Sequence, residues 1–193
     1  MITNRDKEVI KWVEEYKAIT LKQATELFFK GSYKSTSRRM AQLEEMGILQ
    51  SYISKGKKEK VYCQEKKVND HRLYIYDYIK ELKRLGCDLL GIKIEPKYLK
   101  GSIIPDALIF FRYEDYKYLT LLEVDYTHFT DNIKMNTLYE KLYQERESYK
   151  EFLGTFPMVV IARPTEGVRY NSNNFEVIYT DLEYSNLKQF LLQ

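Results

Sequence analysis

The sequence predicts an α+β protein in two parts, a small helix-rich part over residues 1–66 and an α/β part with a mixed sheet over residues 67–193. In the first part, apolar residues recur at helical spacing and then alternate as in a hairpin. The second part contains most of the strand-like apolar runs. Charge divides in the same way. Residues 1–72 hold 16 Lys and Arg against 10 Asp and Glu, a net +6, and residues 73–193 hold 15 against 18, a net −3. Such asymmetry suggests two parts with different partners.

Length and composition exclude several classes of protein. A chain of 193 residues can bury a core without a metal or a disulfide. Its two cysteines, Cys63 and Cys87, do not make a disulfide scaffold. The longest apolar runs are far shorter than a membrane span, and the polar first residues are unlike a signal peptide. We therefore expect a cytoplasmic protein with reduced thiols and no membrane partner.

Three helices are predicted before residue 47. Each begins at a side chain that can cap a helix N-terminus, namely Thr3 or Asn4, then Thr20, then Ser35. Gln23, three residues after Thr20, completes a capping-box pattern. Residues 30–32 break the second helix, and Gly47 ends the third, which runs to about Met46.

A hairpin is predicted after these helices. Residues 48–53 and 59–63 are strand-like, and residues 54–58 between them form a basic tip that contains glycine. Helix, short helix, turn, helix and hairpin is the layout of a winged helix-turn-helix. In such a domain the third helix enters the major groove of DNA.

Basic and polar residues are placed where such a domain meets DNA. Arg and Gln can contact base edges, whereas Ser and Lys suit phosphates. Basic residues of the wing suit the DNA backbone. The expected contacts of the third helix are Tyr33, Lys34, Ser35, Ser37, Arg38, Arg39 and Gln42, and those of the wing are Lys55, Lys57, Lys58 and Lys60. We therefore expect double-stranded DNA as the partner, and the alternative is a protein-binding winged helix with solubilising charges.

The second part reads as α-β-β-β-α-β followed by βα. A helical stripe over residues 71–85 is closed by Gly86. The predicted strands are residues 89–94, 103–111, 118–126, 158–162 and 175–179, and the predicted helices are residues 131–153 and 183–192.

The predicted turn between strands 103–111 and 118–126 fixes the register of these two strands. A turn centred on residues 114 and 115 places Asp106 opposite Glu123, on the same face of neighbouring antiparallel strands. Asp125, two residues beyond Glu123, points to that face as well. Three such acids would suit Mg²⁺ or Mn²⁺, which could neutralise charge developing on a phosphodiester. Alternatively, the register is off by one or the acids lie at a solvated sheet edge.

These residues carry a resemblance to a known family. Pro105-Asp106 followed by Glu123-Val124-Asp125 resembles the PD-(D/E)xK nuclease-like fold. More narrowly, residues 104–107 and 121–125 resemble the plasmid replication-relaxation family, in which a winged helix precedes a nuclease-like domain. The resemblance implies a DNA-binding protein of a plasmid or other mobile element. It would act in replication, mobilisation or conjugation, with replication or mobilisation proteins as further partners.

The sequence departs from the nuclease pattern at one position. The pattern has Lys two residues after the Glu, where this chain has Asp125, and Lys134 in the following helix is a candidate replacement. We therefore expect a DNA-binding protein whose second domain is not fully catalytic. A homodimer would suit such a protein, since palindromic DNA sites mirror a two-fold axis. The alternative is a Mg²⁺- or Mn²⁺-dependent nickase with Asp106, Glu123, Asp125 and Lys134 as its catalytic residues. The two histidines, His71 and His128, are too few for a histidine-triad relaxase.

Overall fold

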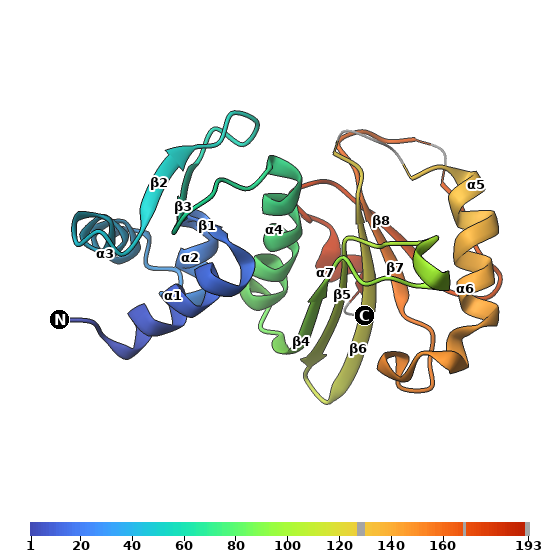
Figure 1. Ribbon diagram of the computed structural model, residues 1–193. Coiled ribbons are helices and arrows are strands. Elements are labelled where there is room, and N and C mark those ends of the chain that lie inside the picture. Colours follow the sequence, from blue (N-terminus) through green and yellow to red (C-terminus); the bar gives the residue numbers. More distant parts are fainter. Residues whose placement is uncertain (127–129, 168, 192–193) are drawn as a thin grey trace. The chain divides into compact units, whose positions relative to one another are not determined.

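The computed structural model describes residues 1–126, 130–167 and 169–191, with side chains up to residue 189 (Figure 1). It confirms a mixed α+β protein. The chain divides into two compact units, Met1–Arg84 and Leu85–Gln193. The boundary follows Arg84 and not Lys66, so the helix after residue 70 packs with the first unit.

The helices of the first unit begin mostly where the caps predict. They are α1 (Asn4–Tyr16), α2 (Leu21–Phe28), α3 (Tyr33–Glu45) and α4 (Asp70–Arg84). Complete capping boxes join Thr3 to Asp6 and Thr20 to Gln23. Ser32, not Ser35, occupies the N-cap of α3, so this helix begins earlier than the sequence indicates.

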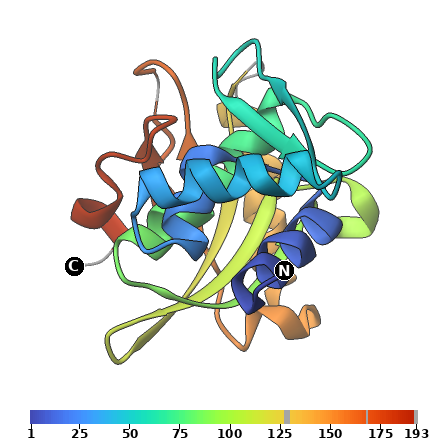
Figure 2. The ribbon, with the colours of Figure 1, turned by 90° about the vertical axis from the view of Figure 1, so that its left-hand side faces the viewer.

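A small antiparallel sheet accompanies these helices. Its strands are β1 (Ala18–Thr20), β2 (Gln50–Ile53) and β3 (Lys60–Cys63), in the order β1-β3-β2. The β2–β3 pair is the expected hairpin, and Figure 2 shows it above α3, which faces the viewer. The sequence analysis missed β1, because three consecutive buried residues show no alternation.

Helix α4 is tied to the first two helices. The Tyr76 hydroxyl donates to the carbonyl of Tyr16, and its ring lies edge-on to Trp12 at 5.9 Å between centroids. The buried Gln23 side chain donates from Nε2 to the carbonyl of Leu73 at 2.8 Å. These contacts, made 50 or more residues apart, explain why α4 belongs to the first unit.

The second unit contains a mixed five-stranded sheet, as expected. Its strands are β4 (Asp88–Ile94), β5 (Ala107–Tyr113), β6 (Tyr116–Val124), β7 (Met158–Ala162) and β8 (Val177–Thr180), in sequence order across the sheet. Strands β4, β5 and β6 are antiparallel, whereas β6, β7 and β8 are parallel. A 3-10 turn, η1 (Leu99–Gly101), precedes β5. Strand β5 begins at Ala107 and not at residue 103, because residues 103–106 lie outside the ladder.

The helix after β6 is shorter than the sequence predicts. It consists of α5 (Asn132–Lys134), the π-helical η2 (Met135–Tyr139) and α6 (Glu140–Gln144), capped by the Asp131 side chain. Two 3-10 turns, η3 (Arg146–Ser148) and η4 (Lys150–Phe152), replace its expected last part. The final helix, α7 (Leu187–Leu191), also begins later than expected. Among the described residues, no helix is long and apolar enough to cross a membrane.

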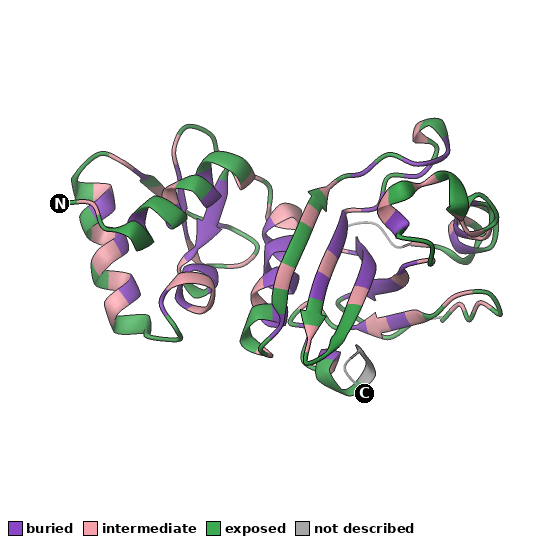
Figure 3. Cartoon of the chain, turned by 90° about the horizontal axis from the view of Figure 1, so that it is seen from below, coloured by how far each residue is buried: buried purple, intermediate pink, exposed green. Residues whose placement is uncertain are grey.

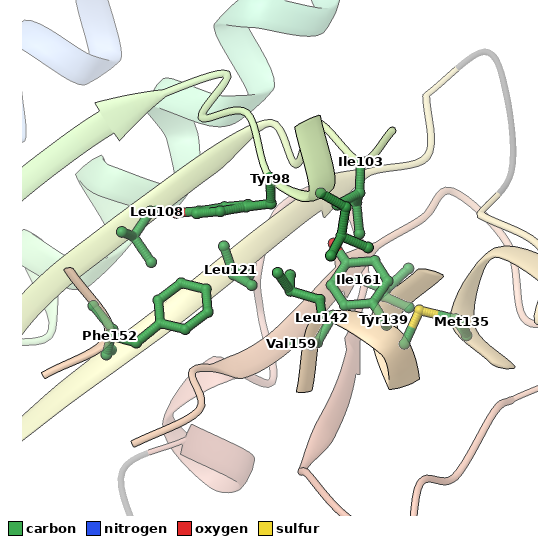
Figure 4. Close-up of a cluster of buried hydrophobic side chains, with 12 residues drawn as sticks. Tyr98, Ile103, Leu108, Leu121, Met135, Tyr139, Leu142, Phe152, Val159 and Ile161 are labelled. Atoms are coloured by element: carbon green, nitrogen blue, oxygen red, sulfur yellow. The ribbon is translucent and has the colours of Figure 1, made fainter. Parts of the chain in front are cut away.

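The core of the second unit lies between the sheet and the η2–α6 helix. Figure 4 shows Leu121, Val159 and Ile161 of the sheet beside Tyr139 and Leu142 of this helix. Figure 3 shows that buried residues concentrate in the inner strands, whereas β4 is mostly exposed. The core therefore holds the end of β6, and with it Glu123, against the helix that carries Lys134.

Candidate functional site

The outer face of α3 presents a group of polar and basic side chains. Tyr33 is 58% exposed, and Lys34, Arg38 and Gln42 are exposed as well. Ser35 and Ser37 are half-buried on the same helix. Most of the side chains expected to face DNA from α3 are therefore open to solvent.

Arg39 departs from this expectation, because its guanidinium is bound within the protein. Its Nε and Nη2 atoms lie 2.9 and 2.6 Å from the two carboxylate oxygens of Asp6, which is 1% exposed. Its Nη1 atom donates to the Gln42 side chain at 2.8 Å. Hydrogen bonding from Arg39 holds the pKa of Asp6 well below its usual range. Arg39 thus fastens α3 to the start of α1 and orients Gln42.

The wing offers fewer free lysines than the sequence predicts. Lys55 and Lys58 are exposed at its tip. Lys60 forms an ion pair with Glu44 of α3 at 2.7 Å, and its side chain is 39% exposed. Lys55 and Lys58 are therefore accessible to DNA as expected, whereas Lys60 is partly occupied by its ion pair with Glu44.

The structure corrects the prediction that Lys57 contacts DNA. Its side chain is only 4% exposed and forms an ion pair with the buried carboxylate of Asp77 in α4. Its Nζ atom also lies 4.0 Å from the centre of the Tyr74 ring. The sequence predicts an exposed lysine because the tip is basic and polar. The structure shows that this lysine anchors the wing to α4 and is not available to a phosphate.

The acids of the second unit lie near the end of β6. Residue pairs from Tyr113 with Tyr116 to Ala107 with Leu122 confirm the predicted register. Asp106 lies just outside this ladder, and its N–H donates to the carbonyl of Leu122, one residue before Glu123, its predicted partner. Its carboxylate accepts a hydrogen bond of 2.6 Å from the backbone N–H of Val124.

Glu123 is buried between a lysine and a tyrosine. Lys134 Nζ lies 2.6 Å and the Tyr139 hydroxyl 2.5 Å from the same oxygen, Oε1. Burial raises the pKa of Glu123 to about 7, against the opposing effects of Lys134 and Tyr139, and nearby Asp106 adds to the rise. Burial, with the Glu123 charge second, also raises the pKa of Tyr139 well above its usual value. The structure therefore brings together three of the four predicted catalytic residues, Asp106, Glu123 and Lys134.

Asp125 is held apart from this group. Its Oδ1 atom accepts hydrogen bonds from the N–H and the hydroxyl of Thr130 at 2.8 and 2.7 Å. Its other oxygen, Oδ2, lies 3.1 Å from Arg163, which directly follows β7. Within residues 1–126, 130–167 and 169–191, no three His, Cys, Asp or Glu side chains are placed to hold a metal ion together. The three acids therefore do not converge as expected, because Asp125 pairs with Arg163 instead. His128 lies outside the described residues.

Tyr139 and Arg163 are residues whose contacts sequence reasoning missed. Tyr139 reads as a packing residue of an amphipathic helix, yet its hydroxyl binds Glu123. Arg163 follows a buried strand, and no local pattern connects it with Asp125, 38 residues earlier. The signal that could have found it is its position, since the ends of parallel neighbouring strands meet at one sheet edge.

Comparison with protein-family models and with curated proteins finds no match for this chain.

Proposed function

We propose that the first unit is a winged helix-turn-helix that binds double-stranded DNA. The observation that carries this proposal is the exposed row of Tyr33, Lys34, Arg38 and Gln42 on α3, next to a hairpin tip that exposes Lys55 and Lys58. The element order α1-β1-α2-α3-β2-β3 is the order that such a domain needs.

The contacts divide by chemistry. Arg38 and Gln42 are the candidates for base edges, because both side chains can make paired hydrogen bonds in the major groove. Gln42 is already oriented by its bond from Arg39, so less freedom is lost when it binds. Lys55 and Lys58 are candidates for phosphates, which contribute affinity that depends on salt and not on sequence.

The test begins with selection of a duplex from a randomised library by the full chain. Binding of that duplex and of a random duplex is then compared for each variant. Arg38→Ala and Gln42→Ala should weaken the selected duplex more than the random one. Lys58→Ala should weaken both and reduce the salt slope by about 1. Lys11→Ala, which removes an exposed lysine of α1, is the matched control.

Two results would contradict the proposal. One is that no duplex is enriched by the selection. The other is that Lys11→Ala and Lys58→Ala have equal effects, because binding would then follow net charge and not the wing.

For the second unit we propose a nuclease-like domain that is not fully catalytic and serves the DNA-binding function. On the basis of the resemblance to the replication-relaxation family, we propose that the chain acts in replication or mobilisation of a plasmid or other mobile element. The ion pairs of Asp125 with Arg163 and of Glu123 with Lys134 support the absence of a complete metal site. These carboxylates already have cationic partners, so the three acids do not fit a shared Mg²⁺ or Mn²⁺ ion.

A metal-dependent nickase is the second candidate function. It is favoured by one observation, the contact of Lys134 with Glu123 beside Asp106, because a nuclease needs a lysine at its acids. Supercoiled plasmid incubated with the full chain and Mg²⁺ or Mn²⁺ decides between the two. Nicking that Glu123→Ala and Lys134→Met abolish would establish the nickase. Absence of nicking, with no metal bound in calorimetry, would leave the binding protein.

A further inference from the structure

A second polar site lies at the carboxyl ends of β7 and β8. It is a pocket of about 210 Å³, lined by Arg163 after β7, Thr180 at the end of β8, the following Asp181, and Asn186. The loop after Arg163 closes one side, and a side chain on Gly167 would come within 3.3 Å of the Arg163 guanidinium. Open α/β sheets bind their ligands at the carboxyl ends of parallel strands.

Two buried polar atoms of this pocket lack a partner. Thr180 is 4% exposed, and its hydroxyl makes no hydrogen bond with any residue that the structure describes. The same holds for Asn186 Oδ1. The amide of Asn186 is fixed in this orientation, because its Nδ2 atom donates to the carbonyl of Tyr179 at 3.1 Å. An unsatisfied buried polar atom destabilises a folded protein, so two in one pocket indicate that a polar ligand completes them.

One cation of the pocket, Arg169, is left for an anionic group, because Arg163 already forms an ion pair with Asp125. The guanidinium carbons of Arg163 and Arg169 lie 4.6 and 5.7 Å from the centre of the Tyr179 ring, so both cations gather at one wall. Asp181 is engaged in its own turn, where it accepts from the Ser185 hydroxyl and from two backbone N–H groups. Arg169 forms no ion pair with a described residue. Two lining acids oppose an anion, namely Glu166, which is exposed on the loop, and Asp181, whose hydrogen bonds come from neutral groups and leave its charge in place.

We propose that this pocket binds a phosphate monoester together with the sugar that carries it. A guanidinium and a hydroxyl are donors that suit phosphate oxygens, and a sugar hydroxyl can donate to Asn186 Oδ1. The pocket is smaller than the roughly 300–1,000 Å³ of sites that enclose drug-sized ligands, so a base would remain outside. The source is either a free nucleotide or the phosphorylated end of a DNA strand. The proposal does not rest on DNA binding by the first unit.

Calorimetry with the full chain tests the proposal, with four probes. These are inorganic phosphate, deoxyadenosine 5′-monophosphate, and one single-stranded oligonucleotide with a 5′-phosphate or a 5′-hydroxyl. Binding of the mononucleotide alone identifies a small-molecule site, and preference for the 5′-phosphate oligonucleotide identifies a strand-end site. Binding of none of the four at millimolar concentration would overturn the proposal and leave water as the only occupant.

Variants test the residues. Arg169→Ala and Thr180→Val should each weaken binding about tenfold or more, the effect of one lost bond to a charged group. Glu166→Gln should leave binding unchanged or strengthen it, because it removes a negative charge. Arg112→Ala, which removes an exposed guanidinium at the far end of β5, is the control. Weaker binding in Glu166→Gln with no change in Arg169→Ala would refute the assignment, because the anion would then not be held by Arg169.

Folding of the Thr180→Val protein supplies an independent measurement. Replacement of an unsatisfied hydroxyl by a methyl of the same shape should leave the free energy of unfolding unchanged or raise it. A clear loss of stability would show that the hydroxyl has a partner inside the free protein, which would also overturn the proposal.

Discussion

Replacement of Lys57 by methionine is expected to destabilise the first unit and not to remove a DNA contact. Methionine keeps most of the apolar length of the side chain and removes the ammonium that lies against Asp77 and over the Tyr74 ring. Asp77 is 3% exposed, so its carboxylate cannot recover the lost partner from water.

The expected magnitude follows from what remains around Asp77. Removal of one member of a buried ion pair costs about 3–5 kcal/mol. Two partners stay in place, Lys80 Nζ at 3.4 Å and Gln23 Nε2 at 3.1 Å. We therefore expect the lower end of this range, a loss of about 3 kcal/mol in the free energy of unfolding.

Urea unfolding of a double-mutant cycle measures the contribution of the Lys57–Asp77 ion pair to stability. Lys57→Met, Asp77→Asn and the double variant are compared with the parent protein. The double variant removes both charges of the Lys57–Asp77 pair and leaves only Lys80 without its carboxylate, so its loss should be smaller than the sum of the two single losses. Lys58→Met, at the exposed neighbouring position, should change stability by less than about 0.5 kcal/mol and should weaken duplex binding.

One result would refute the reasoning. If Lys57→Met and Lys58→Met unfold at the same urea concentration and weaken duplex binding equally, the Lys57 side chain faces solvent in solution. The wing would then present three free lysines, as the sequence alone suggests.

Three further predictions concern groups whose environment is set by burial or capping. The pKa of Glu123, raised from about 4.5 to about 7, means that stability is full below pH 4.5 and is lost as pH rises through 7. At about 1.4 kcal/mol for each tenfold change in ionisation, Glu123→Gln should gain about 3 kcal/mol relative to the parent between pH 5 and pH 8 in urea unfolding. Asp6 has a lowered pKa, so the stability it provides is present above its ordinary value of 3.8 and is lost in acid. Asp6→Asn should lack that acid-dependent loss, and an unchanged acid transition would contradict the Arg39 contact. Thr20→Ala should cost about 1 kcal/mol by thermal or urea unfolding, since it opens a buried capping box, whereas no loss would show that the cap is dispensable.

Local rules predicted much of the fold, because their causes lie within a few residues. The capping box at Thr20 joins residues three apart and begins α2 as expected, whereas the structure selects Thr3 from the two caps that the sequence offers for α1. The two-residue turn between Tyr113 and Tyr116 set the register of β5 and β6. The same rules were less reliable for the helix after Asp131. Its apolar stripe continues beyond Gln144, so the sequence predicts a longer helix than the structure has.

The sequence by itself therefore determined most of the elements, the register of β5 and β6, and the side chains that carry charge. Only the tertiary structure decided which charges are free. Arg39 meets Asp6, Lys57 meets Asp77 and Arg163 meets Asp125 across 33, 20 and 38 residues. The physical reason is that an ion pair depends on distance in space and on burial, and neither is encoded in the spacing along the chain.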